Sequence, residues 1–444
     1  MSEASSPEPH EAEGSLVRAI GPWTLGANAV NLTIGAGIFA LPAVVATILG
    51  PAAFLAYLIC GALILLVLTC FAEVGSQVTR SGGAVAYIEE AFGPQAGFVA
   101  WVVFILAYCA ASDAAIAHVM MDALAIGFPA LSGGPARALA FALCFGGLAW
   151  VNVRGVRQGV RVAMAATVAK LVPLLLLAAV GVFAVERPNL AWTGWPSMDQ
   201  LGAGTLLLFF AFGGAESALT PSGEIREPAR TVPRAMLGGI GAVVLLYLVL
   251  QFVAQGVLGS ALAEGGTTPL ADVAQRLGGG AARGVVVACT AVAVFGVLAA
   301  DMMGSPRAFL AVAEDGMLPR ALARIHPRFH TPWIAILVYA ALTLLLTLSG
   351  GFKALAVLSG MALLLVYLAV CLAALQLRYR RPAVPESFRA PGGPTVALLA
   401  SAVVVWVLTH STRRETLGMV ALIAASSIYY LIRRRTSLRS ASHG

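Results

Sequence analysis

Four ionisable residues lie inside long apolar stretches of this chain and are the first candidates for chemistry. They are Asp113, Lys170, Glu216 and Asp301. If these stretches cross a lipid bilayer, each charged and unpaired side chain costs roughly 2.5–3.5 kcal/mol on insertion scales. Together they cost about 10–14 kcal/mol, which is comparable to the net stability of a whole domain. We therefore expect these residues to be paired, protonated or in contact with a water-filled cavity.

The composition indicates that lipid is the solvent for most of the chain. Of 444 residues, 59% are hydrophobic and 11% are charged, and the mean hydropathy is +0.88. Soluble domains carry about 25% charged residues. Stretches long enough to cross a bilayer as a helix fall at twelve places: 22–48, 51–77, 95–127, 136–153, 160–184, 202–222, 235–259, 284–312, 332–349, 353–377, 394–410 and 416–432. The sequence therefore predicts an all-α integral membrane protein with twelve transmembrane helices.

Basic residues are distributed unevenly between the two sides that these spans define. With the N-terminus inside, twenty of the 28 basic residues fall in cytoplasmic segments and seven in outer segments, which leaves Lys170 within the fifth span. Because cytoplasmic loops are enriched in Lys and Arg, both termini are predicted to be cytoplasmic, in a plasma or inner membrane. The net charge of +7 then reflects topology, and no nucleic-acid partner is expected.

The polar ends of the chain set the expected organisation. Residues 1–20 are polar and acidic and are expected to form a disordered cytoplasmic N-terminus. A core is expected over 21–377, followed by two peripheral helices over 378–432 and a cytoplasmic tail over 433–444.

Two spans contain glycines followed by a proline. The first span carries IGAGIFALP, with Pro42 after its glycines, and the sixth carries FFAFGGAESALTP, which ends at Pro221. Five spans separate them, so the two segments run in opposite directions. Such interrupted spans indicate an inverted-repeat transporter with its site near the bilayer midplane, because freed backbone groups must line a cavity or meet a polar ligand. The alternative is that the glycines only allow close helix packing.

Four segments together resemble the amino acid–polyamine–organocation (APC) superfamily of permeases. They are IGAGIFALP, RSGGAVAYIEEAFGP, FFAFGGAES followed by EIREPARTVPRAM, and AEDGMLPRALARIHPRFHTPWIAI. The resemblance implies a LeuT-type fold with two inverted repeats of five helices, about 21–186 and 200–377. Helices 1 and 6, the first helix of each repeat, are broken.

The resemblance also implies which groups bind the substrate. The amides of Ala36 and Gly37 are implied to bind a carboxylate, and the carbonyls of Phe210, Ala211 and Gly213 an α-amine. Relatives often carry a bulky residue in place of Gly213, so a roomier pocket is expected here.

The resemblance gives two of the ionisable residues alternative roles. In sodium-independent relatives a lysine in a similar context occupies the place of a bound sodium ion, and Lys170 is implied to do the same. Because burial disfavours its charged form, Lys170 could exchange a proton, or it could form a permanent pair that ties the fifth span to the first or eighth. Glu216 could act in gating and proton sensing, or it could cap the second half-helix.

The two aspartates are candidates for substrate contact. By register with the motifs, Ser112 and Asp301 fall at positions that face the central cavity in relatives, and Asp113 is adjacent. Either aspartate could hold a second positive charge on a substrate, and Asp301 could instead pair with Lys170.

The leading functional prediction is a secondary active amino acid transporter, sodium-independent and either proton-coupled or exchanging. The alternatives are a carrier of polyamines, diamines or cationic amino acids, and a membrane sensor without flux. An enzyme is not expected, since no metal-ligand spacing, nucleophile elbow or phosphate-binding loop is present. No cofactor or metal is expected, the partners are substrate, protons and lipid, and the oligomeric state stays open.

Overall fold

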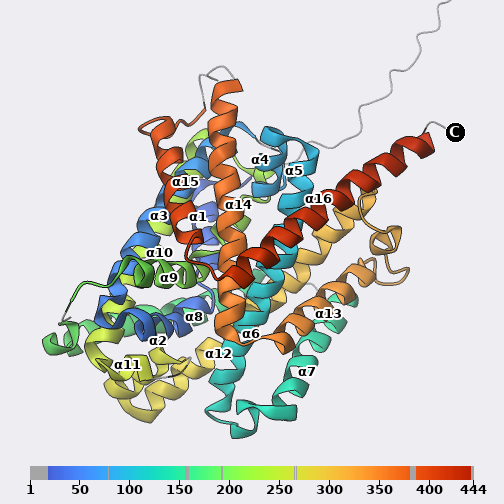
Figure 1. Ribbon diagram of the computed structural model, residues 1–444. Coiled ribbons are helices and arrows are strands. Elements are labelled where there is room, and N and C mark those ends of the chain that lie inside the picture. The colour runs from blue at the N-terminus through green and yellow to red at the C-terminus, as the bar shows by residue number, and fades with distance from the viewer. Residues whose placement is uncertain are drawn as a thin grey trace, which may run out of the picture.

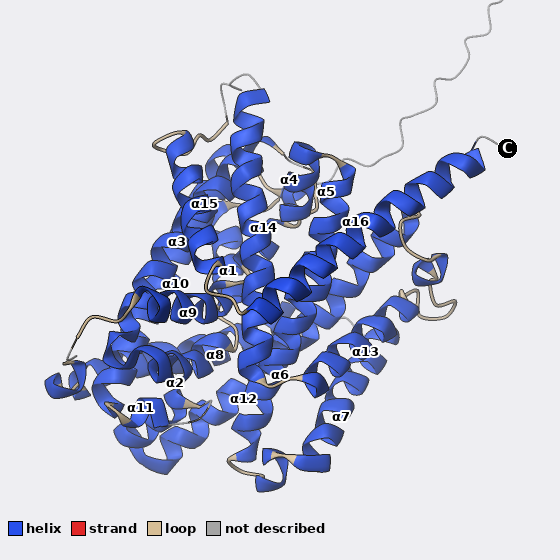
Figure 2. Ribbon diagram, in the orientation of Figure 1, coloured by secondary structure: helices blue, strands red, loops and turns tan. Residues whose placement is uncertain are grey.

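The described part of the chain is helical. The computed structural model describes residues 19–441 except 79, 156–159, 192–193, 265, 267 and 381–386, and these residues form no strand (Figure 1 and Figure 2). The predicted all-α class is therefore confirmed for them. Most of the predicted disordered N-terminus lies outside the described residues. The α-helices are α1 (Pro22–Thr33), α2 (Gly37–Leu49), α3 (Ala53–Gln77), α4 (Gly83–Phe92), α5 (Pro94–Val102), α6 (Ala110–Ala125), α7 (Gly134–Val153), α8 (Val160–Gly181), α9 (Met198–Phe209), α10 (Pro228–Leu258), α11 (Ala261–Glu264), α12 (Pro269–Glu314), α13 (Trp333–Ser349), α14 (Phe352–Arg380), α15 (Pro394–Leu408) and α16 (Arg413–Ala441).

The helices have the length and composition of a multi-pass membrane protein. Within the described ranges, eight helical stretches are long and apolar enough to cross a membrane, and three shorter apolar helices accompany them. Large apolar side chains stand exposed on the outer faces, such as Leu175 on α8, Leu345 on α13 and Ile428 on α16. Apolar surface of this extent would be unfavourable in water, so it is suited to lipid.

Helices that are distant in sequence build the interior. α10 packs against α1 and α3, α12 against α6 and α8, and α14 against α6 and α15. α16 runs obliquely across the front of the molecule in Figure 1 and packs on α5. The described part of the range 378–432, predicted to be peripheral, contains the end of α14, all of α15 and most of α16, and the predicted tail from 433 onward continues α16 as far as Ala441.

Two of the predicted spans are interrupted at their glycines. The first is divided between α1 and α2 by residues 34–36. In the sixth, α9 ends at Phe209 and two short 3₁₀ turns follow, η6 (Phe210–Phe212) and η7 (Ala215–Leu219). A seven-residue π-helix, η2 (Val103–Cys109), joins α5 to α6.

An ion pair joins α3 to α14 at the end of α14. The Arg378 Nε and Nη2 atoms lie 2.7 and 2.6 Å from the two carboxylate oxygens of Glu73, and the Ala390 amide donates to the same carboxylate at 3.0 Å. The Glu73 side chain is 4% exposed and the Arg378 side chain 16%. A two-pronged pair with an additional amide donor has its geometry fixed on both sides, so it holds the loop before α15 against α3.

We expect Arg378→Ala to destabilise the protein by about 3 kcal/mol, because removing one partner leaves a buried carboxylate uncompensated. The matched control is Arg80→Ala, which removes the pair between Arg80 and Glu89, whose side chains are 52% and 35% exposed, and should cost about 0–1 kcal/mol. Thermal unfolding in detergent measures both. Equal small effects of the two substitutions would contradict the assignment.

Candidate functional site

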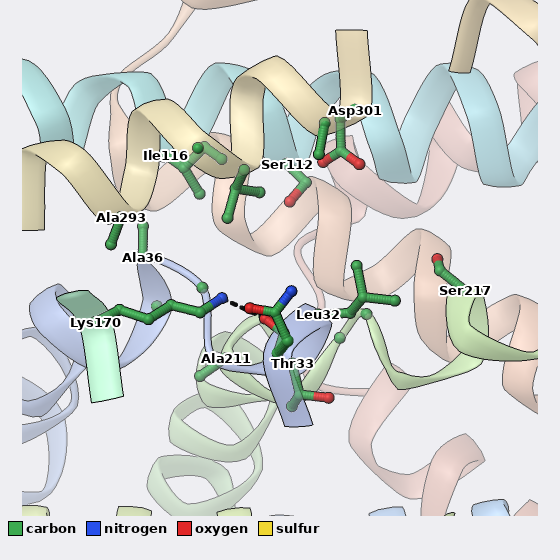
Figure 3. Close-up of a pocket in the computed structure, with 18 of the residues that line it drawn as sticks. Leu32, Thr33, Ala36, Ser112, Ile116, Lys170, Ala211, Ser217, Ala293 and Asp301 are labelled. Atoms are coloured by element: carbon green, nitrogen blue, oxygen red, sulfur yellow. Dashed lines mark hydrogen bonds between the residues drawn. The ribbon is translucent and has the colours of Figure 1, made fainter. Parts of the chain in front are cut away.

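A cavity of about 430 Å³ lies where the two interrupted spans meet α6, α8 and α12. Its lining includes the 34–36 break and the turns after α9, with Asn31 and Thr33 from the end of α1 (Figure 3). The volume is in the range of pockets that bind small molecules. The cavity is therefore the candidate binding site.

Eight of the ten predicted site residues line this cavity: Ala36, Gly37, Ser112, Lys170, Phe210, Ala211, Gly213 and Asp301. The other two, Asp113 and Glu216, are buried behind the lining, with 0% and 1% of their surface exposed. Figure 3 shows Asp301 and Ser112 near one another, with Lys170 reaching in from another side.

The break between α1 and α2 leaves backbone groups in the cavity. Gly35 donates to the Thr33 carbonyl at 2.8 Å, and Phe39 donates to the Ala36 carbonyl at 3.0 Å. Within the described residues, the Ala36 amide donates no backbone hydrogen bond, and Gly37 begins α2, where the first N–H groups of a helix have no intrahelical partner. These two amides can therefore donate hydrogen bonds to an anionic group such as a carboxylate.

The second break contributes carbonyl groups of residues that line the same cavity. Gly213 is extended, with φ −71° and ψ 156°, and Gly214 has a φ of 112°, a conformation that favours glycine. In the described structure no backbone amide donates to the carbonyls of Ala211 or Gly213. Carbonyl oxygens accept hydrogen bonds, so this side of the cavity suits an ammonium group.

The two breaks pack directly on each other. A Cβ atom at position 37 would lie 2.7 Å from the Ala211 Cα atom, and one at 214 would lie 2.4 Å from the Leu32 carbonyl oxygen. Close packing, the alternative explanation for the glycines, is thus present together with the unwound backbone. A Cβ atom at Gly213 would lie 2.7 Å from the Tyr108 hydroxyl, so the room that this glycine leaves is taken by a tyrosine.

Glu216 bonds the backbone of its own turn. Both carboxylate oxygens accept from the Gly214 amide at 3.1 Å, and the Tyr367 hydroxyl of α14 donates to it at 2.5 Å. Glu216 therefore satisfies an amide within the second break and connects this break to α14.

Lys170 reaches the other break. Its side chain is buried, with 3% of the residue exposed, and its ammonium donates to the Asn31 carbonyl in the last turn of α1. Within the described chain no ion pair shorter than 4 Å joins Lys170 to Asp301. The lysine thus ties α8 to α1 through a backbone oxygen.

Several residues at the site were not predicted. Tyr339 of α13 donates to the Asp113 carboxylate at 2.8 Å, and Tyr247 of α10 donates to the Thr33 carbonyl at 3.1 Å. Tyr108 also lines the cavity, but it lies in the π-helix η2, where residue counting does not assign a face. The other tyrosines come from spans whose only sequence signal is their apolar character.

The site has no metal-binding character in the part of the chain that the structure describes. Those residues contain no group of three or more His, Cys, Asp or Glu side chains that could hold a metal ion. The arrangement instead offers free amides, free carbonyls, one ammonium and one cavity-facing carboxyl group, which suits reversible binding of a small zwitterion.

Comparison with known proteins gives a match over nearly the whole chain. Residues 20–430 match the profile of a family described as amino acid permease. The chain is 28% identical over 436 residues to the serine/threonine exchanger SteT of Bacillus subtilis (strain 168), covering 96% of this chain and 99% of the relative.

Two further relatives extend the match. The branched-chain amino acid permease BcaP of the same organism is 25% identical over 446 residues, which cover 96% of this chain and 95% of the relative. The large neutral amino acids transporter small subunit 2 of Rattus norvegicus is 27% identical over 405 residues, which cover 87% of this chain and 75% of the relative. All three relatives are named as transporters rather than enzymes.

The contact between the breaks predicts that alanine lowers stability at one of two nearby glycines and has no effect at the other. Gly37→Ala places a methyl group against the Ala211 backbone and should lower both thermal stability and ligand-induced stabilisation. At Gly35, a Cβ atom would meet only the Thr33 carbonyl oxygen, at 4.0 Å, so Gly35→Ala should unfold at the wild-type temperature. Thermal-shift measurements in detergent test both. Equal unfolding temperatures for the two variants would contradict the packing described here.

Proposed function

Because this chain belongs to the amino acid permease family, we propose that it carries amino acids across a membrane by alternating access to the cavity between its two broken spans. The observation that carries the proposal is that amides without backbone partners at Ala36 and Gly37, and carbonyls without backbone partners at Ala211 and Gly213, belong to residues lining one cavity. An α-amino acid carries its carboxylate and its ammonium on the same α-carbon, so it can bind both sets at once.

The finer architecture that we propose is the twelve-span LeuT-type arrangement, with two inverted repeats of five helices. The family membership supports it, and so do the two breaks, which lie in the first and sixth apolar spans and pack on each other. Cytoplasmic termini and a plasma or inner membrane location are supported by the distribution of basic residues.

Lys170 supports a sodium-independent mechanism. Its ammonium donates to a backbone carbonyl of α1, and carbonyl oxygens of this kind are also ligands for hard cations. A fixed ammonium at this position takes the oxygen ligand and the volume that a sodium ion would need. We propose that Lys170 and Glu216 take part in coupling and gating, with protons or substrate exchange supplying the energy.

The substrate is proposed to be an amino acid of the kind that the relatives' names indicate. SteT is named for serine and threonine, BcaP for branched-chain amino acids and the rat relative for large neutral amino acids. A second candidate, a cationic amino acid or diamine, is favoured by one observation: Asp301 lines the cavity, where its carboxyl group could meet a second ammonium.

Counterflow in proteoliposomes tests the function directly. Vesicles loaded with unlabelled L-serine should accumulate radiolabelled L-serine, and L-threonine, L-leucine, L-lysine and putrescine should be added as competitors. Competition by L-threonine or L-leucine supports a neutral amino acid transporter, whereas competition by L-lysine and putrescine alone supports the cationic alternative. Absence of counterflow with every compound in the panel, used in turn as the loaded substrate, would contradict transport.

Sodium dependence is a separate prediction of the Lys170 position. Replacing sodium by choline at constant pH and membrane potential should leave the initial rate of uptake unchanged, because the cation site is already filled by the ammonium. A rate that falls in proportion to the sodium concentration would show that sodium binds elsewhere and that Lys170 does not replace it.

A further inference from the structure

Two carboxyl groups meet behind the wall of the cavity. α6 packs against α12, and this packing brings the side chains of Asp113 on α6 and Asp301 on α12 within interaction range of one another. Asp301 lines the cavity, whereas Asp113 has no exposed surface. From the sequence, the two residues are separate candidates for substrate contact, but the structure brings them together as one unit.

The donors around Asp113 satisfy only one side of its carboxyl group. The Tyr339 hydroxyl donates to Oδ2 at 2.8 Å. The other oxygen, Oδ1, is buried and receives no hydrogen bond from any N–H or hydroxyl group of the described residues. A buried carboxylate oxygen without a donor is costly, so the structure needs a proton between the two carboxyl groups.

The charge on the pair leads to the same conclusion. Ionising both of two neighbouring carboxyl groups in a region of low dielectric constant has a large free-energy cost, because the two negative charges repel each other. A single shared proton removes the repulsion and supplies the missing donor, which leaves the pair with one negative charge.

The titratable groups facing the pair come from four neighbouring elements. They are Tyr339 of α13, Tyr108 and Cys109 of η2, Cys144 of α7 and Lys170 of α8. Of these only Lys170 is a basic group, and it faces Asp301 across the cavity. Glu216 of η7 is held by Gly214 and Tyr367 instead.

We propose that Asp113 and Asp301 form the proton-binding site of the transporter, a use of the cavity that rests on the proposed function. One proton is bound when the Asp301 carboxyl lies against Asp113. When Asp301 turns toward Lys170, that proton leaves to water in the cavity, and two carboxylates remain. The Tyr339 hydroxyl then stabilises Asp113, and the Lys170 ammonium stabilises Asp301. Each cycle thus moves one proton, and its release is coupled to a contact between α12 and α8.

Infrared spectroscopy of the purified protein tests the proton without any substrate. The C=O stretch of a protonated carboxyl group, identified by its shift in D₂O, should be present in the wild type. Asp113→Asn and Asp301→Asn should each remove the same band, because the remaining carboxylate accepts from the new amide. The double variant should lose no more of the band's intensity than either single variant does, because the pair shares one proton.

Two control variants separate this site from other carboxyl groups. Asp272→Asn alters an aspartate on the segment of α12 before its kink at Gly279, where it pairs with Arg283 at 3.4 Å, and should leave the band unchanged. Lys170→Ala should also keep the band, because the lysine is not the proton carrier. Retention of the full band in both Asp113→Asn and Asp301→Asn would overturn the proposal.

Transport measurements separate the failure of this proposal from the failure of the proposed function. In proteoliposomes, wild-type L-serine counterflow tests transport itself. Asp113→Asn should keep L-serine counterflow but lose accumulation driven by a pH gradient. Undiminished pH-driven accumulation in this variant would overturn the proton site while leaving the transporter assignment intact. A selective loss of L-lysine and putrescine counterflow, with pH-driven L-serine uptake preserved, would also overturn it and would make the pair a cation-binding subsite.

Discussion

The satisfaction of backbone groups at two interrupted helices is the constraint on which the rest of the structure depends. Inside a bilayer every freed N–H and C=O group needs a partner. The end of α1 finds its partners in side chains from distant helices, because Lys170 donates to the Asn31 carbonyl and Tyr247 to the Thr33 carbonyl. In the second break, Glu216 accepts from the Gly214 amide. The amides and carbonyls that remain without backbone partners belong to residues that line the cavity, so the proposed binding site is the part of the backbone that the protein leaves unsatisfied.

This constraint also explains the ionisable residues that the apolar composition makes expensive. Lys170 and Glu216 each form a hydrogen bond with backbone at one of the breaks, and the side chains of Asp113 and Asp301 interact with each other. None of the four faces lipid: three are buried with at most 3% of their surface exposed, and Asp301 faces the cavity. The insertion cost of each residue is therefore offset by a specific contact, and the contact of Lys170 joins α8 to α1. Such contacts are suited to linking proton or substrate binding to helix movement.

The sequence predicted the parts of the site that depend on local backbone chemistry. Glycine and proline positions located both breaks, and the depth of Lys170 within an apolar span located the basic group of the cavity. The contact of Asp113 with Asp301 could not be predicted in the same way. The π-helix at Val103–Cys109 changes the register of the following helix relative to a regular α-helix, so the faces of Ser112 and Asp113 cannot be assigned by counting residues. The tyrosines that complete the site come from α10, α13 and α14, and their positions depend on tertiary packing that no local pattern encodes.

The central claim is that the two breaks bind the two ends of one zwitterion, and a structure determined with a bound amino acid tests it most directly. Cryo-electron microscopy of the protein with the amino acid that shows the strongest counterflow should place the carboxylate at the amides of Ala36 and Gly37. The ammonium should lie at the carbonyls of Ala211 and Gly213. A ligand bound in the cavity with neither group at these positions, or continuous helices through residues 34–36 and 210–214, would contradict the account.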